Sequence, residues 1–392
     1  MLREIGFING FRAIAAFWVL TAHCMIWGGA NESIIPEPKL AVDLFMIISG
    51  YLMALNANVR ENKEPLKKPS SWFIFWLRRY FRLAPTYYFS LLLVILSSEY
   101  FLSGFQTLRD INPQRWETDT LYDPKLIHYT IENIFYHITF VFGLLPKYSF
   151  STFLPDWSLS LEMQFYFAFP FIYLLMRTWG FFRMGLLLAF AAWLLNKIII
   201  KIAWLNGITW LFHEPSILPM KLQYFLVGIL VYEIGWNLTL SMYNKRLYMA
   251  LALGLTLMEA KHYQLSVLCL PLSVILMLTV QQQTIQWKPI VWMRSLLGSR
   301  LMHFASEAAY SVYLFHGFFI SLCGLVIAIN PGLLSVEPAL RVGLMWLFVT
   351  LCSYSMAFLI FNYVENPGIR MGKYLIEELQ NKLRNKTPLT NE

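Results

Sequence analysis

The sequence of 392 residues is 57% hydrophobic and 14% charged, with a mean hydropathy of +0.51. This composition excludes an ordinary soluble domain, in which about a quarter of the residues carry charge. At this hydropathy the net charge of +8 indicates basic loops beside a membrane, and no basic low-complexity tail favours nucleic acid as a partner. Apolar windows of about 20 residues recur along the chain, enough to cross a hydrocarbon core about 30 Å thick. We therefore predict an all-α polytopic membrane protein.

We expect about ten transmembrane helices. In chain order they cover residues 8–28, 39–58, 84–102, 157–176, 184–205, 218–236, 247–260, 264–282, 308–329 and 341–362. Residues 128–145 are also apolar, but they contain Glu132 and Asn133 and end at Pro146, which predicts a re-entrant or interfacial helix. The stretch 103–127 is rich in Asp, Asn, Pro and Gly and is typical of a solvated loop.

Basic residues orient these helices. If residues 128–145 do not cross and the N-terminus lies inside, 20 of the 31 Lys and Arg residues fall in cytoplasmic segments and 10 fall outside. This positive-inside bias predicts that both termini are cytoplasmic. We expect a membrane-embedded domain at 1–365 and a charged cytoplasmic tail at 366–392, with the first segment a retained span because it lacks a small-residue cleavage site.

The four cysteines all lie in apolar stretches without paired spacing: Cys24, Cys269, Cys323 and Cys352. They favour neither a disulfide framework nor a zinc site, so we expect packing residues and no metal. No internal repeat is visible, which disfavours a transporter built from duplicated halves.

The first predicted helix places Arg12 and His23 eleven residues apart in "GFRAIAAFWVLTAHC". On an α-helix this separation is roughly three turns plus 20°, or about 16 Å, so the two side chains share one face. Charge that faces lipid costs several kcal/mol, which predicts that this face borders a protein-lined cavity. The alternative is that Arg12 reaches the headgroups and a neighbouring helix satisfies His23.

Asp43 lies in the second predicted helix, within "AVDLFMIISGYLM" and close to its outer end. A buried carboxylate needs a partner, and we expect His23, because a carboxylate that accepts one ring N–H leaves the other nitrogen basic. The alternative is that Asp43 caps the helix at the interface.

Arg79 and Arg82 follow in "WLRRYFRLAPTYY", one helical turn apart and just before Pro85, which we expect to open the third span. Two forked guanidinium groups at this spacing suit a polyphosphate. The alternative is that they contact lipid headgroups or enforce topology.

The fourth predicted span begins in "PDWSLSLEMQFYF", where a polar face includes Trp157, Ser158, Ser160, Glu162 and Tyr166. Glu162 and Tyr166 are four residues apart and so share a face. An aromatic belt with a capping Asp or Ser would account for Trp157, but it would leave Glu162 unexplained.

Two late segments also carry polar groups. In "AAYSVYLFHGFF", Tyr313 and His316 lie one turn apart, although tyrosines are also common at membrane interfaces. In "YVENPGIR", Glu365 precedes Pro367, which predicts a helix terminus or a structural ion pair.

Together these segments resemble the acyltransferase-3 family of integral membrane proteins, which O-acylate carbohydrates and some other acceptors. The family's motifs occur in order along essentially the whole chain, at Arg12 with His23, at Asp43 to Tyr51, at Arg79 with Arg82, at Trp157 to Glu162 and at Tyr313 to His316. The chain departs from the family pattern at three positions, since Met46 and Tyr51 replace phenylalanines and Met163 replaces a second glutamate.

The resemblance implies transfer of an acetyl group from acetyl-CoA to a hydroxyl of a cell-surface or exported polysaccharide, in a bacterial cytoplasmic (inner) membrane. It implies His23 as the general base or acyl carrier and three groups of residues: His23, Asp43 and Glu162 for catalysis, Arg12, Arg79 and Arg82 for the donor, and Trp157, Tyr166, Tyr313 and His316 for the acceptor. The partners it implies are membrane lipids, the carbohydrate acceptor and proteins of glycan assembly. Larger relatives carry an appended esterase-like domain, so this chain either completes the chemistry itself or hands over to a partner.

Other functions stay open at this stage. Within the enzyme class, one alternative is a donor with a succinyl or longer acyl group, and another is a small-molecule acceptor such as a macrolide. In another class, a transporter or flippase would use the same intramembrane ionisable groups as a permeation path.

Overall fold

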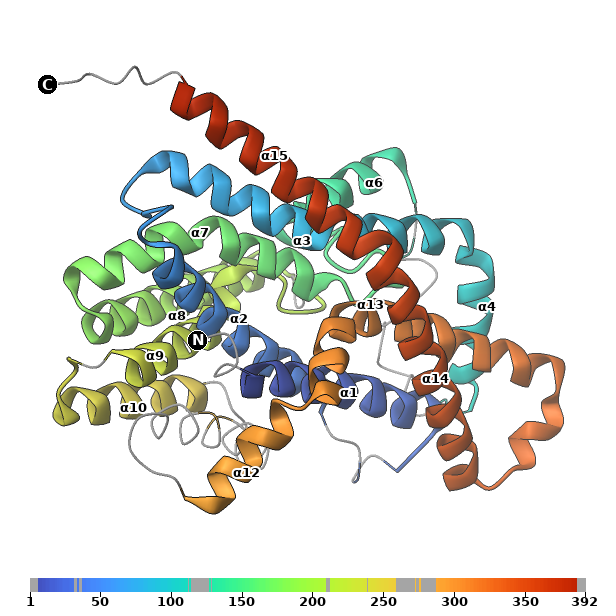
Figure 1. The fold of residues 1–392 in the computed structure, drawn as a ribbon. Coiled ribbons are helices and arrows are strands. Elements are labelled where there is room, and N and C mark those ends of the chain that lie inside the picture. The colour runs from blue at the N-terminus through green and yellow to red at the C-terminus, as the bar shows by residue number, and fades with distance from the viewer. Residues whose placement is uncertain are drawn as a thin grey trace, which may run out of the picture.

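The computed structural model describes residues 6–258 and 287–385, apart from 32–33, 35–36, 112, 114–126, 128, 209–211 and 238, together with residues 272 and 275. Over these residues the chain is helical and has no strand, as predicted. The α-helices, seen in Figure 1, are α1 (Gly6–Gly28), α2 (Pro38–Arg60), α3 (Pro69–Leu96), α4 (Ser98–Arg109), α6 (Ile131–Ile138), α7 (Trp157–Trp179), α8 (Phe181–Leu205), α9 (Leu222–Trp236), α10 (Met242–Leu257), α12 (Lys288–Leu297), α13 (Arg300–Ile329), α14 (Pro338–Ile360) and α15 (Asn366–Asn385). Short 3₁₀ turns lie at η3 (Phe142–Leu144), η4 (Leu218–Met220) and η6 (Pro331–Ser335), and η7 (Phe361–Glu365) is a π-helix.

Six helical segments in the described part of the chain are long and apolar enough to cross a membrane. They are Gly6–Gly28, Pro38–Arg60, Trp157–Trp179, Phe181–Leu205, Arg300–Ile329 and Pro338–Lys382, and the bent pair α3 and α4 makes up to seven. The expected number of about ten is therefore not confirmed. Helices α9 and α10 contain only 15 and 16 residues, fewer than the roughly 20 of a full crossing. The expected span 264–282 falls largely outside the described residues.

The third helix differs most from its predicted form. It begins at Pro69 and carries Pro85 in its interior, so the expectation that Pro85 opens a span at 84–102 is wrong. Arg79 and Arg82, which precede Pro85, belong to the helix, in keeping with the high helix propensity of Arg. The helix ends at Leu96, and α4 then leaves at 78°, so helix also replaces the beginning of the loop expected at 103–127.

The segment 128–145 does not form a crossing helix where the structure describes it. Helix α6 has eight residues, about 12 Å, which is too short to cross a bilayer. Thr130 caps this helix by accepting a hydrogen bond from the Asn133 backbone N–H at 3.1 Å. This agrees with the predicted interfacial or re-entrant segment.

Helices α2 and α9 approach each other closely because each has a glycine at the contact. A side chain at Gly228 would collide with the carbonyl of Ile47, and one at Gly50 would collide with the carbonyl of Phe225. On the other side of the bundle α1 packs against α13. These two pairs position α1, α2 and α13, which carry half of the polar residues that line the cavity described below.

Helix α14 does not end where the sequence suggested. The π-helix η7 joins it to α15, so the predicted helix terminus at Glu365 is wrong and the helix continues, with a change of direction, into α15 (Figure 1). The described part of the predicted charged tail is thus helical, and it packs along α3.

Candidate functional site

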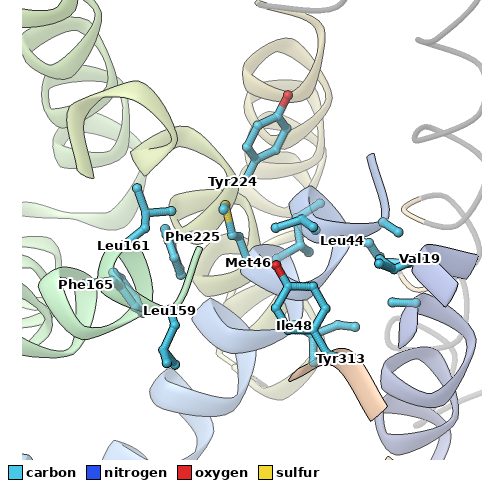
Figure 2. Close-up of a cluster of buried hydrophobic side chains, with 14 of the residues drawn as sticks. Val19, Leu44, Met46, Ile48, Leu159, Leu161, Phe165, Tyr224, Phe225 and Tyr313 are labelled. Atoms are coloured by element: carbon cyan, nitrogen blue, oxygen red, sulfur yellow. The ribbon is translucent and has the colours of Figure 1, made fainter. Parts of the chain in front are cut away.

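A cavity of about 110 Å³ lies among α1, α2, α3, α7, α9 and α13. Part of its apolar wall is visible in Figure 2, where Met46, Leu159 and Phe225 lie near Tyr313. The polar side chains that line it come from segments far apart in the sequence: Arg12, Ser49, Arg82, Ser158, Glu162, Tyr166, Tyr310 and Tyr313. A concave site with a few convergent polar groups in an apolar bundle is typical of a ligand-binding site.

Two guanidinium groups, those of Arg12 and Arg82, border this cavity. Arg82 forms an ion pair with Glu365, whose side chain is fully buried, and Ser311 donates a hydrogen bond to the same carboxylate at 3.4 Å. The ion pair considered for Glu365 is therefore confirmed. Among the described residues no carboxylate lies within ion-pair distance of Arg12, although Glu162 lines the same cavity.

Arg79 lies apart from this cavity. Its guanidinium carbon is 5.6 Å from the centre of the Phe75 ring and 5.8 Å from that of Tyr166, which borders the cavity. It lines a small separate pocket with Arg60, Arg78 and Glu64. Glu64 pairs with Arg60 at 3.7 Å and with Arg78 at 2.6 Å, whereas no carboxylate in the described part of the chain pairs with Arg79. The two arginines of the motif therefore border different spaces, although Tyr166, which lines the cavity, also lies beside Arg79.

Glu162 is held by two hydroxyl groups. Tyr166 donates a short hydrogen bond to Glu162 Oε1, as the four-residue spacing predicted, and Ser49 Oγ donates to the same oxygen at 3.1 Å. Nearby, the hydroxyls of Ser158 and Tyr313 lie 2.8 Å apart and join α7 to α13. Trp157 is different, since it packs in the hydrophobic core outside the cavity lining, and its predicted contact with the acceptor finds no support here.

His23 pairs with His316. The Nδ1 atom of His23 lies 2.7 Å from Nε2 of His316, and the rings stack with centroids 5.0 Å apart. Nδ1 of His316 lies 3.2 Å from the Val312 carbonyl, so this nitrogen carries the proton that it donates. His316 Nε2 then accepts from His23 Nδ1–H, which leaves Nε2 of His23 with a free lone pair.

The expected partnership of His23 with Asp43 is therefore wrong, because His316 takes that place. Neither histidine lines the cavity. Tyr313 does line it, and its ring lies 6.2 Å from the His316 ring. The expectation that Arg12 and His23 face one cavity is wrong, because only Arg12 lines it. His316 contacts His23 instead of the cavity where it was expected to bind an acceptor.

Asp43 binds Lys221, with Nζ at 2.8 Å from Oδ1 and 3.1 Å from Oδ2. It lies inside α2, and Glu37 is the residue that caps this helix, so the capping alternative for Asp43 is wrong as well. Both partners of the ion pair are buried. The pair joins α2 to the start of α9, and the signal in the sequence was a lone lysine directly before an apolar segment.

A second polar cluster was not predicted from the sequence. Asp156 accepts hydrogen bonds from Tyr87 at 3.0 Å and from Thr152 at 2.9 Å, and it lies 3.3 Å from Nδ1 of His137. Ser151 Oγ lies 3.2 Å from His137 Nε2. The order Ser, His and Asp is that of a hydrolase triad, but all three side chains are buried to 1% exposure, so the cluster fastens the segment after α6 to α3 and α7.

Within the described residues, no three side chains of His, Cys, Asp or Glu are grouped as ligands for a metal ion. Cys24, Cys323 and Cys352 are free thiols, and Cys269 lies outside the described residues.

A family model described as an acyltransferase domain matches residues 5–361, which include every residue of the cavity lining. The chain is also similar to the peptidoglycan O-acetyltransferase OatA of Listeria monocytogenes serovar 1/2a, at 25% identity over 230 residues. That match covers 55% of this chain and 30% of the relative, so the chain spans less than a third of that protein's length in the match. No solved structure matches the chain.

Proposed function

This chain belongs to the acyltransferase-domain family, and we propose that it transfers an acetyl group from acetyl-CoA to a hydroxyl of a cell-surface or exported polysaccharide. One observation carries this proposal. Ionisable side chains from α1, α3, α7 and α13 converge on one cavity between helices that otherwise are apolar, one turn of α13 away from a histidine pair. Similarity to a peptidoglycan O-acetyltransferase supports a polymer of the cell envelope as acceptor.

The arginines support an anionic donor. Arg12 and Arg82 border the cavity, and Arg79 lies on the other side of the Tyr166 ring with Arg60 and Arg78. Guanidinium groups bind phosphate through two parallel N–H donors, and a buried cation without a carboxylate gains most from such a partner. The phosphates of CoA would enter from this basic end of the bundle, which the positive-inside bias places in the cytoplasm.

His23 acts as the general base in this proposal. Its Nε2 takes the proton from the acceptor hydroxyl while the hydroxyl oxygen bonds to the thioester carbonyl carbon. The C–S bond then breaks, and the CoA sulfur receives the proton from the imidazolium. His316 accepts the hydrogen bond from Nδ1–H throughout and holds the orientation of the ring.

Glu162 and Tyr166 bind the acceptor in this scheme. The carboxylate can accept hydrogen bonds from sugar hydroxyls, and Ser49 and Tyr166 hold it in place. The Tyr313 ring lies 6.2 Å from the His316 ring, and in this scheme its phenol stabilises the developing oxyanion.

Replacement of the base tests the proposal. His23→Ala should lower acetylation of envelope polysaccharide by at least about 100-fold, the usual contribution of a positioned general base. The measurement is mass spectrometry of the polymer from cells with equal membrane abundance of each variant. The matched control is His303→Ala, which removes an exposed histidine of α13 that pairs only with Glu307. Normal acetylation in His23→Ala would end the proposal.

A further inference from the structure

Glu365 lies outside the region that the family model matches, yet its carboxylate reaches the edge of the cavity through Arg82. It is fully buried, and Ser311 of α13 and Arg82 of α3 are its polar contacts. A carboxylate so deeply buried is stable only with such partners. The pair thus connects the end of α14 to a cavity residue.

The backbone brings Glu365 to this place by two features. The π-helix η7 adds a residue to one turn, which turns Glu365 toward the protein while Tyr363 stays exposed. Beyond it, Gly368 and Gly372 lie on the same face of the helix, at three and seven residues from Glu365. A side chain at Gly368 would collide with the Pro85 ring, and one at Gly372 would collide with Phe81.

The two residues of α3 that α15 contacts lie on either side of Arg82 in the sequence. Phe81 and Pro85 are its near neighbours in the helix, and α15 rests on both, as its path across α3 in Figure 1 shows. The docking of α15 on α3 therefore fixes the carboxylate opposite this one guanidinium.

The ion pair of Arg82 with Glu365 affects the balance of charge around the cavity. Arg12, Arg82 and Glu162 border the same space, and the two like charges of the arginines repel each other more strongly there than they would in water. Glu365 balances one of them and binds Arg82 through Nη1, which leaves other N–H donors of the fork available. An anionic group in the cavity would then bind an Arg82 guanidinium that Glu365 already holds in a fixed orientation.

We propose that Glu365 is a positioning residue for donor binding, which holds the Arg82 guanidinium where an anionic group of the donor binds, with α15 as its support. This proposal rests on the proposed function. Glu365 touches no reacting atom, so its loss should raise the KM for the donor and leave kcat at saturating donor nearly unchanged.

A double-mutant cycle with radiolabelled CoA as the probe tests this role. Glu365→Gln in the full chain should weaken CoA binding about tenfold, the lower end of the loss found when the hydrogen-bond partner that orients a metal ligand is removed. Arg82→Ala should weaken binding as well, and Glu365→Gln should add no further loss in the Arg82→Ala background. The matched control is Glu214→Gln, which removes another buried carboxylate, paired with Lys39 at 3.1 Å, and should leave CoA binding unchanged.

A second pair of variants reaches the same contact through the backbone. Gly372→Val should push α15 away from Phe81 and reproduce the loss of CoA affinity, while Gly343→Val in α14, where the space is open, should not. Equal losses from Glu365→Gln with and without Arg82, or unchanged CoA binding in Glu365→Gln, would overturn the role of Glu365 alone. A wild-type chain that binds no CoA would instead overturn the proposed donor, and this inference with it.

Discussion

At the scale of residues, the side chains singled out by motif and hydropathy are largely those that meet in the structure, but their partners differ. His23 pairs with a second histidine and Asp43 with a lysine. A carboxylate beside the imidazole of His23, the base in the proposed function, would both orient the ring and balance its charge. His316 only orients it, and Asp43 serves to hold α2 against the start of α9.

The Asp43–Lys221 pair yields a stability prediction. Asp43→Ala leaves a buried ammonium without a partner and should destabilise the protein by about 3–5 kcal/mol. The double variant Asp43→Leu/Lys221→Met removes both charges and should recover most of the lost stability. Thermal unfolding in detergent measures both effects, and acetylation by the double variant shows whether the carboxylate has any part in the chemistry. A double variant as unstable as Asp43→Ala would contradict the assignment.

At the scale of elements, glycines set how closely helices approach. The pair α2 and α9 is in contact through the backbone at Gly50 and Gly228, and this contact presents Val42, Met46 and Ser49 of α2 to the cavity. These three residues follow helical spacing along one face. The geometry of the cavity thus depends on a contact that carries no polar group.

Gly228→Ala tests this contact. The added methyl group would overlap the Ile47 carbonyl, so we expect a loss of about 1–3 kcal/mol and a lower midpoint of thermal unfolding. The matched control is Gly254→Ala in α10, where the space is open and the change should be neutral or raise stability by up to about 1 kcal/mol. Equal midpoints for Gly228→Ala and the wild type would show that the two helices are free to move apart.

At the scale of the whole molecule, the arrangement in the membrane is still a prediction from charge. Asn31 follows α1, and Asn62 lies between α2 and α3 among basic residues, so the two belong to opposite sides if α1 and α2 both cross.

Accessibility of introduced cysteines tests this orientation. In a chain with its four native cysteines replaced, a membrane-impermeant maleimide applied to intact cells should label Asn31→Cys and spare Asn62→Cys. Both positions are exposed, so accessibility depends on the side of the membrane alone. A tag after residue 392 should stay protected from protease in the same cells. Labelling of Asn62→Cys would show that the topology is inverted. The pocket lined by Arg60, Arg78 and Arg79 would then lie on the side opposite a cytoplasmic donor.

The sequence by itself determined the all-α class and the apolar helices, and it singled out five residues that line the cavity, Arg12, Arg82, Glu162, Tyr166 and Tyr313. It could do so because hydropathy and charge are local properties and a charge inside an apolar helix is costly wherever the helix lies. Spacing along one helix also predicted the contact of Tyr166 with Glu162. Only the tertiary structure decided that Lys221 pairs with Asp43, that His316 pairs with His23 and that Arg79 and Arg82 line separate pockets. Those contacts depend on which helices pack together and at what rotation, and packing arises from shape complementarity over many residues that no local pattern contains.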